Sequence, residues 1–250
     1  MERFLRIDRL IGREKREILH HKKVTVVGVG AVGSYAVEAL ARSGVGALTL
    51  IDFDRVEITN LNRQLIALES TLGQLKIDAA QRRILDINPR CRVATRPIFV
   101  DQTNLEDLFS DSPDIVVDAI DSVDSKVALL EYLWRNNIPV VSSMGAALRT
   151  DPEKLTRGDL METNGCPLAR QLRQRLRRLG VGPGITAVYS TENVDFSLQA
   201  EVEIPEGPRR PTSRGLLGSL PTLTGMFGLF AANEALASLL GGLTPGAVKQ

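Results

Sequence analysis

The stretch Val24–Gly33, VTVVGVGAVG, decides the fold of this chain. It opens with Val24–Val29, a short apolar run rich in β-branched residues, which is typical of a strand buried on both faces. A turn that contains Gly28, Gly30 and Gly33 then leads into a helix, which we expect over Ala31–Ser43. Backbone N–H groups at such a helix start face an anion, and the helix dipole favours negative charge there. The stretch therefore predicts a strand–turn–helix unit that binds the phosphates of a nucleotide.

An acidic strand end supports the same prediction. The next predicted strand, Ala47–Ile51, runs into the segment Ile51–Gln64, IDFDRVEITNLNRQ. In nucleotide-binding folds of this kind, a carboxylate at the position of Asp52 accepts hydrogen bonds from ribose hydroxyls. A glycine turn alone also occurs at purely structural junctions, but the acidic residue makes nucleotide binding the favoured interpretation.

Cationic side chains favour ATP over NAD as the nucleotide. Arg63 lies in the polar loop and Lys76 near the start of the following helix. Arginine offers a planar fork for phosphate oxygens and lysine a compact charge, whereas hydride transfer needs no cations aimed at a triphosphate. Asp121 follows another apolar run, and its carboxylate suits Mg²⁺, which prefers carboxylates plus substrate phosphates. Each residue alone could be a surface charge, but the set predicts ATP and Mg²⁺ as cofactors.

Strands and helices alternate along the first part of the chain. The remaining predicted strands are Cys91–Thr95, Ile115–Ile120, Pro139–Ser142 and Ala187–Thr191, and the remaining predicted helices are Gln74–Ile87, Leu105–Phe109, Ser125–Asn136 and Leu168–Leu179. This alternation predicts an α/β, Rossmann-like, doubly wound and mostly parallel sheet with a C-terminal extension. We expect a single domain over residues 1–250, with a nucleotide-binding core at 22–146 and a substrate-side extension at 147–250.

Bulk composition excludes several classes of protein. The net charge of +1 means that any affinity for nucleic acid must come from a local patch. Two cysteines, Cys91 and Cys166, do not make a disulfide framework, and no CxxC pair is present for a structural zinc, so we expect the cytoplasm. The apolar segment Leu216–Leu243 contains Pro221 and Glu234, and we expect a buried helix there with no stable membrane insertion.

A basic helix supplies the local patch. Within Leu168–Leu179 the arginines are Arg170, Arg173, Arg175, Arg177 and Arg178, and a proline-rich loop adds Arg209, Arg210 and Arg214. Clustered cations on one surface bind a phosphate backbone, although a solvated helix face gives the same pattern. Because leucines supply an apolar stripe on this helix, both interpretations are compatible with the sequence.

Taken together, the motifs GVGAVG, IDFDRVEITNLNRQ, GQLKIDAAQRRILDINP and DAIDS resemble the ThiF/MoeB/HesA superfamily. These proteins are bacterial relatives of ubiquitin-activating enzymes and adenylate a carboxylate with ATP and magnesium. The resemblance implies that Asp52 contacts the ribose, that Asp121 lies at the metal, and that the phosphates are held by Asn60, Arg63 and Lys76.

The N-terminal segment RFLRIDRLIG carries a further implication. Arg6 resembles the arginine that in such enzymes reaches into the nucleotide site of the partner subunit. The resemblance therefore implies a homodimer, with Arg6 as a catalytic residue beside Arg63, Lys76 and Asp121.

Within the superfamily, several segments resemble the tRNA threonylcarbamoyladenosine dehydratases: RFLRIDRLIG, SYAVEALARSGVG, VSSMGA, CPLARQLRQRLRRLG and GSLPTLTGMFGLFAANEAL. Such enzymes use ATP to activate the carboxylate of a modified adenosine in tRNA, which then closes into a ring with loss of water. The resemblance implies tRNA as the partner of the patch formed by Arg170, Arg173, Arg177 and Arg178. Family association also suggests a partner from a cysteine desulfurase system.

Three other functions stay open from the sequence. One is an adenylating enzyme for a ubiquitin-like sulfur carrier, which the absence of CxxC pairs disfavours. The second is an NAD-dependent oxidoreductase, and the third is a non-catalytic partner of a cysteine desulfurase. Cys166 lies in a Gly-Cys-Pro turn, where it is either a thioester or persulfide carrier or a small apolar residue.

Overall fold

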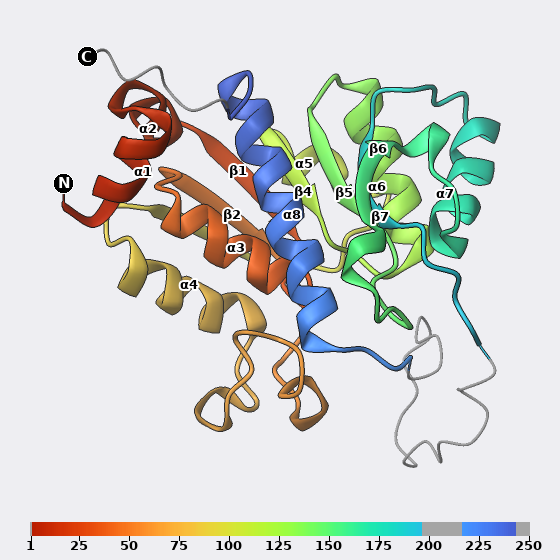
Figure 1. Cartoon of the computed structure of the whole chain (residues 1–250), viewed down its shortest axis with the longest axis horizontal. Coiled ribbons are helices and arrows are strands. Elements are labelled where there is room, and N and C mark those ends of the chain that lie inside the picture. The colour runs from red at the N-terminus through yellow and green to blue at the C-terminus, as the bar shows by residue number, and fades with distance from the viewer. Residues whose placement is uncertain (1, 197–216, 244–250) are drawn as a thin grey trace.

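A seven-stranded sheet organises the computed structural model, which describes residues 2–196 and 217–243 (Figure 1). The strand order is β3-β2-β1-β4-β5-β7-β6. The strands are β1 (Lys23–Val27), β2 (Ala47–Ile51), β3 (Arg92–Arg96), β4 (Ile115–Asp118), β5 (Val140–Ser143), β6 (Leu155–Asp159) and β7 (Thr186–Ser190). All neighbours are parallel except β6 and β7. The predicted Rossmann-like class is confirmed.

Helices cover both faces of this sheet. They are α1 (Leu5–Ile11), α2 (Arg13–His20), α3 (Gly33–Arg42), α4 (Lys76–Ile87), α5 (Leu105–Leu108), α6 (Val123–Arg135), α7 (Pro167–Arg178) and α8 (Pro221–Leu240). Short 3₁₀ turns lie at η1 (Glu2–Phe4), η2 (Ile58–Asn60), η3 (Glu69–Thr71), η4 (Pro152–Lys154) and η5 (Leu160–Glu162). In Figure 1, α3, α4 and α8 lie in front of the sheet and α6 lies behind it.

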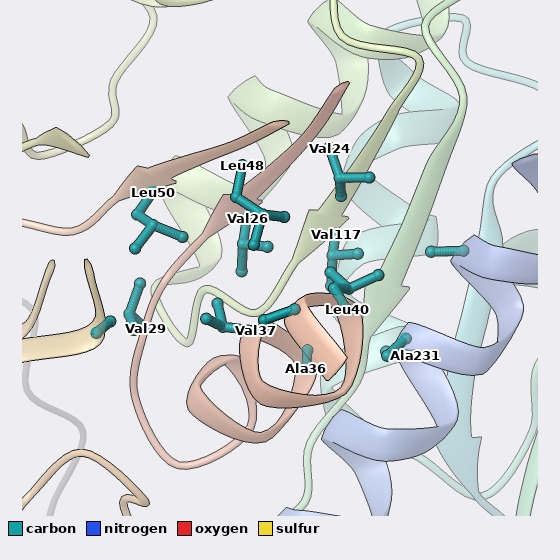
Figure 2. Packing of buried hydrophobic residues seen from close by; sticks show 14 of the residues in the cluster. Val24, Val26, Val29, Ala36, Val37, Leu40, Leu48, Leu50, Val117 and Ala231 are labelled. Atoms are coloured by element: carbon teal, nitrogen blue, oxygen red, sulfur yellow. The ribbon is translucent and has the colours of Figure 1, made fainter. Parts of the chain in front are cut away.

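Each face of the sheet has its own apolar core. On the face of α3 and α8, Val24, Val26 and Leu48 pack with Leu40 and Ala231 (Figure 2). On the opposite face, a second cluster joins the strands to helices α5, α6 and α7, with members that include Val27, Val116, Leu129 and Leu172. Alternate residues of β1 thus enter different clusters, as the period of two in a strand requires.

The C-terminal helix α8 is built into the first of these cores. Leu223, Phe227 and Ala231 are buried, and the helix packs against α3, β4 and β5. By length and by a mean hydropathy of 1.4, α8 would also suffice to cross a membrane, but half of that window is buried inside the fold. Its outer face leaves Met226 and Leu229 exposed.

Several predicted boundaries were wrong for local reasons. The predicted strand Ile115–Ile120 ends at Asp118, because the Asp118 side chain accepts a hydrogen bond from the Ile120 N–H and turns the backbone. Strand β6 was missed, since it is a polar edge strand that pairs with β7 alone. The division of the chain at residue 146 stays a prediction, although β5 and β7 belong to one sheet.

Candidate active site

Three parallel strands bring the predicted motifs to one edge of the sheet. Strand β1 lies between β2 and β4, with Val27 opposite both Ile51 and Asp118. The segments that follow these strands are the glycine turn, the Asp52 loop and the Asp121 loop, so they leave the sheet side by side. In open α/β sheets, ligands bind outside the carboxyl ends of the strands.

The glycine turn is closed by contacts that allow no side chain at two positions. Gly28 has a φ of +86°, and a Cβ there would lie 2.8 Å from the Ala119 carbonyl oxygen. A Cβ at Gly33 would overlap with the Gly28 carbonyl oxygen. Gly30 differs, because the nearest atom to a Cβ there is the Gln64 Nε2 at 3.8 Å. The first and last glycines therefore shape the turn, while Gly30 leaves space beside the backbone.

Asp52 connects this turn with the polar loop. Its Oδ2 accepts a hydrogen bond of 2.7 Å from the Val29 N–H, and its Oδ1 accepts one of 2.8 Å from the Asp54 N–H. Burial raises the pKa of the Asp52 carboxyl, although the nearby Lys76 ammonium and the two N–H donors act in the opposite direction. Each carboxylate oxygen retains further acceptor capacity, which a ribose hydroxyl could use.

The two cationic side chains predicted to bind phosphates differ in their burial and in their hydrogen-bond partners. Lys76 is buried at the start of α4, and its Nζ lies 2.9 Å from Asp54 Oδ2. Arg63 is partly buried, and it donates to the Thr59 carbonyl at 2.8 Å and to Asn62 Oδ1 at 2.9 Å. Both ligands lie in or border the segment between β2 and α4 that also holds Asn60.

Asn60 has a structural role that the sequence did not suggest. It is buried, and its Oδ1 accepts a hydrogen bond of 3.1 Å from the Glu57 N–H, which caps the turn η2. The polar loop is also tied to α3, because the Leu65 N–H donates to Ser34 Oγ at 3.1 Å. The loop therefore has a fixed shape over the glycine turn.

Asp121 is exposed in the loop after β4. Among the described residues it has no hydrogen-bond or ion-pair partner, and no group of three or more candidate metal ligands occurs in that part of the chain. A metal at Asp121 would therefore take most of its ligands from phosphates and water, which is the usual manner of Mg²⁺.

Arg6 is not brought to this edge. It is exposed on α1, which precedes α2, and the Gly46 N–H before β2 donates to the Leu19 carbonyl of α2. The two helices thus lie toward the amino ends of the strands, and Figure 1 shows them at the opposite end of the sheet from the polar loop. Within one chain, Arg6 does not join the other site residues.

Sequence reasoning missed two residues at the site. Asp54, the second acid of the DFD segment, holds Lys76 and supplies the N–H that binds Asp52. Gln64 is buried beside Gly30, and its Oε1 has no hydrogen-bond partner among the described residues. The spacing of Asp54 from Asp52 was visible in the sequence, but the environment of Gln64 was not.

The basic helix α7 presents its arginines unequally. Arg173 donates to Thr163 Oγ1 and Arg177 to the Met161 carbonyl at 3.2 Å, so both contact the segment around η5. Burial, followed by the charge of Arg177, lowers the pKa of Arg173. Arg170 and Arg178 are exposed and have no hydrogen-bond or ion-pair partner within the described ranges. Arg175 pairs with Asp124 at 2.6 Å, and the predicted loop arginines 209, 210 and 214 lie outside the described residues.

Both cysteines are buried and free. Cys91 lies in the core just before β3, and burial raises the pKa of its thiol to about 11. Cys166 precedes α7, and its Sγ would lie 3.9 Å from a Cβ at Gly145. The two interpretations of Cys166, a carrier or a small apolar residue, both stay open. Because its thiol is buried, a carrier role requires the surrounding loop to open first.

Residues 3–249 match the ThiF family, and the chain belongs to this family. A tRNA threonylcarbamoyladenosine dehydratase from Bacillus subtilis is 44% identical over 193 residues, which cover 77% of this chain and 76% of the relative. The enzyme of the same name from Escherichia coli is 39% identical over 251 residues, covering 96% and 94%.

Solved structures of the E. coli enzyme, TcdA, show the same fold. Its complex with AMP has a TM-score of 0.86 at 39% identity and covers 96% of this chain and 94% of that one. Its complex with ATP has a TM-score of 0.86 at 38% identity, with the same coverage. The similarity extends over nearly the whole chain, so it includes the glycine turn, the polar loop and α8.

The balance of charges around Asp52 predicts a pH-dependent effect of Lys76→Met. Because the folded-state pKa of Asp52 is raised, its ionisation costs stability as pH rises through that pKa, and Lys76 offsets part of the cost. The variant should lose about 2 kcal/mol of unfolding free energy near pH 7.5 and less than half of that near pH 4. Urea denaturation at both pH values measures this loss of unfolding free energy.

Lys154→Met is the matched control, since Lys154 is exposed and forms no ion pair with the described residues. It should change the unfolding free energy by less than about 0.5 kcal/mol at either pH. Equal losses for Lys76→Met at both pH values would contradict the electrostatic coupling of Lys76 to Asp52.

Proposed function

We propose that this chain is an ATP-dependent tRNA threonylcarbamoyladenosine dehydratase. The observation that carries the proposal is the meeting of the glycine turn, Asp52 and Lys76 at one sheet edge, with Arg63 in the adjoining loop. It occurs in a chain that is 39% identical over nearly its full length to an enzyme of that name, whose solved structures hold ATP and AMP.

Adenylation suits this site chemically. A carboxylate is a poor electrophile, because its leaving group would be oxide. Attack of a carboxylate oxygen on the α-phosphorus of ATP releases pyrophosphate and gives an acyl-adenylate, and the ring then closes on the activated carbonyl with release of AMP. The closing nucleophile is tethered in the substrate, so the protein mainly positions the reactants and stabilises charge on phosphate oxygens.

Each site residue has a defined part in this scheme. Asp52 orients the ribose from its fixed place against the glycine turn. Lys76 shares its ammonium between Asp54 and the phosphates, and Arg63 offers N–H donors beyond those bound to Thr59 and Asn62. The Asn60 Nδ2, which has only a 3.4 Å contact to Thr59 Oγ1, is free to donate to a phosphate.

Magnesium fits the exposed carboxylate of Asp121. A single carboxylate and phosphate oxygens are a common ligand set for this ion, which keeps several waters and is seldom held by an all-protein cage. When bound, the ion would neutralise charge that develops on the phosphates during transfer. The role of Asp121 itself would be to fix where that charge is placed.

Nucleoside mass spectrometry tests the proposal directly. Incubation of tRNA containing threonylcarbamoyladenosine with the protein and ATP should convert the open side chain to its cyclic form with loss of one water. Arg63→Ala and Lys76→Ala should each slow conversion on the order of 100-fold, the usual cost of removing one group that stabilises transition-state charge. Arg55→Ala is the control, since Arg55 is exposed in the same loop and donates to the Gly73 carbonyl.

The alternatives give different results in the same experiment. Failure to convert the tRNA, with the ATP left unconsumed, would exclude the dehydratase function. Pyrophosphate exchange that requires a ubiquitin-like protein instead of tRNA would favour the sulfur-carrier function, and binding of NAD in preference to ATP would favour an oxidoreductase. Conversion unaffected by Arg63→Ala and Lys76→Ala would remove the assigned site.

The exposed arginines of α7 support tRNA as a partner. Arg170 and Arg178 lie on the face opposite the buried Leu172 and Leu176, and their guanidinium groups are not used within the described fold. Arg173 and Arg177 contribute charge to the same face but also hold the η5 segment. Reversal of these two would therefore mix binding with local structure.

The variant Arg170→Glu/Arg178→Glu should weaken tRNA binding and reduce the slope of log K against log salt by about 0.9 for each phosphate that is no longer neutralised. ATP affinity should not change. Filter binding across a salt series measures both the affinity for tRNA and its salt dependence. The control is Arg82→Glu/Arg90→Glu, which changes the net charge equally at two exposed arginines on or beside α4. Equal losses in both variants would contradict a specific patch.

A homodimer completes the proposed site. Arg6 lies away from its own nucleotide edge. Leu220 just before α8 and Met226 and Leu229 on α8 are exposed, and they give an apolar surface that a second copy could cover. In such a dimer, Arg6 of one subunit would act in the site of the other.

Mixed dimers test this arrangement. Arg6→Ala and Lys76→Ala should each be nearly inactive alone, but random exchange of their subunits should restore about a quarter of the parent activity, because half of the dimers then hold one intact site of two. A mixture of Arg63→Ala and Lys76→Ala should restore none, since both residues act in the same chain's site. No recovery in the first mixture after proven exchange would contradict the role of Arg6.

We place the protein in the cytoplasm, in keeping with two unpaired, buried cysteines and a tRNA substrate. A partner from a cysteine desulfurase system stays a prediction of family association.

A further inference from the structure

A fully buried ion pair lies directly behind the Asp121 loop. Lys126 on α6 and Asp118 at the end of β4 are each 0% exposed, and their Nζ and Oδ2 atoms are 2.7 Å apart. Ser142 Oγ of the neighbouring strand β5 donates to the same oxygen at 2.6 Å. None of these residues has a part in the chemistry described above.

The ion pair fixes both the N–H and the carbonyl of Ile120, the residue before Asp121. The Ile120 N–H donates to Asp118 Oδ1 at 3.1 Å, and the Ile120 carbonyl accepts from Lys126 Nζ at 3.0 Å. One residue earlier, the Ala119 N–H donates to the Val27 carbonyl at 2.8 Å. The backbone that leads to Asp121 is thus fixed by the sheet on one side and by the ion pair on the other.

The elements that carry the pair are themselves rigid. Asp118 lies on a central strand that is hydrogen-bonded on both sides, by β1 and by β5. Lys126 lies in the first turns of α6, and its backbone N–H donates to the Ser122 carbonyl at 3.0 Å. The loop between them spans only the few residues from Ala119 to Ser122. A short loop held at both ends has little freedom to move its exposed carboxylate.

Stability alone is a weak reason for such a pair. The cost of removing two charges from water offsets much of their attraction, and replacement of a buried pair by apolar residues of similar size is often neutral. The hydrogen bonds to Ile120 are what an apolar replacement would lose. The effect of the pair is therefore expected in the geometry of the loop more than in the unfolding free energy.

We propose that Asp118 and Lys126 are positioning residues that hold the Ile120–Asp121 backbone so that the Asp121 carboxylate meets a magnesium ion on the ATP phosphates. The inference rests on the metal role given to Asp121 in the proposed function. It assigns to this chain a supporting pair for the metal-binding carboxylate, in the manner by which outer groups orient metal ligands.

The test measures binding of a non-hydrolysable ATP analogue by calorimetry, with and without magnesium. The metal gain is the ratio of the two dissociation constants. In Asp118→Asn/Lys126→Met, which replaces the charges by groups of similar size, the metal gain should fall at least tenfold while metal-free affinity changes less than threefold. Glu131→Gln/Arg135→Met is the matched control, because it removes an exposed ion pair of 2.9 Å from the same helix. It should keep the full metal gain.

A cycle with Asp121→Ala distinguishes positioning from general damage. Asp121→Ala should remove most of the metal gain, and adding the double variant to it should cause no further loss. If the double variant does not fold by circular dichroism, Ser142→Ala carries the test, since it removes only one hydrogen bond to Asp118. That variant should lower the metal gain about threefold with a Tm close to the parent.

The outcomes separate the two levels of the proposal. A double variant or Ser142→Ala that keeps the full metal gain, while Asp121→Ala removes it, overturns the positioning role and leaves the proposed function intact. A metal gain that survives Asp121→Ala overturns the metal role of Asp121 and the positioning role with it. Loss of metal-free affinity to the same degree as metal-bound affinity also overturns positioning, because it shows general damage to the nucleotide site.

Discussion

One buried carboxylate connects the parts of this site. Asp52 accepts one backbone N–H from the glycine turn and another from the polar loop, and so joins two segments that follow neighbouring strands. Its burial raises its pKa and makes its charge costly, and Lys76 offsets part of that cost. The Asp54 backbone N–H donates to Asp52, and its carboxylate pairs with Lys76. Asp52, Lys76 and the glycine turn therefore form one connected unit. Site geometry and local electrostatics therefore depend on the same few contacts.

The frame around this unit is set by close approaches of the backbone. The turn at Gly28 lies against the Ala119 carbonyl, so the loops that follow β1 and β4 lie next to each other. Ion pairs then hold each loop: Lys76 with Asp54 beside β2, and Lys126 with Asp118 beside β4. In both cases a lysine from the first turns of a helix reaches back to an aspartate near the end of a strand. The partly buried Arg63 and the exposed Asp121 lie on loops that these contacts fix.

Much of this could be predicted from the sequence. Apolar runs such as Val24–Val29 and glycines at fixed offsets depend on local pattern, and they indicated the fold class and the edge where ligands bind. The polar edge strand β6 carries no such pattern and was missed. The capping contact of Asn60, the ion pair of Asp54 and the burial of Gln64 depend on residues brought together only by folding. The same holds for α7, where Arg173 and Arg177 are partly used inside the fold.

The central claim is that the carboxyl edge of the sheet holds a triphosphate for attack by a carboxylate. A crystal structure of the chain with ATP and magnesium tests it most directly. We expect the ribose at Asp52, the phosphates against Lys76 and Arg63, and the metal between Asp121 and phosphate oxygens. A triphosphate directed away from these side chains, or nucleotide bound elsewhere on the protein, would contradict the claim.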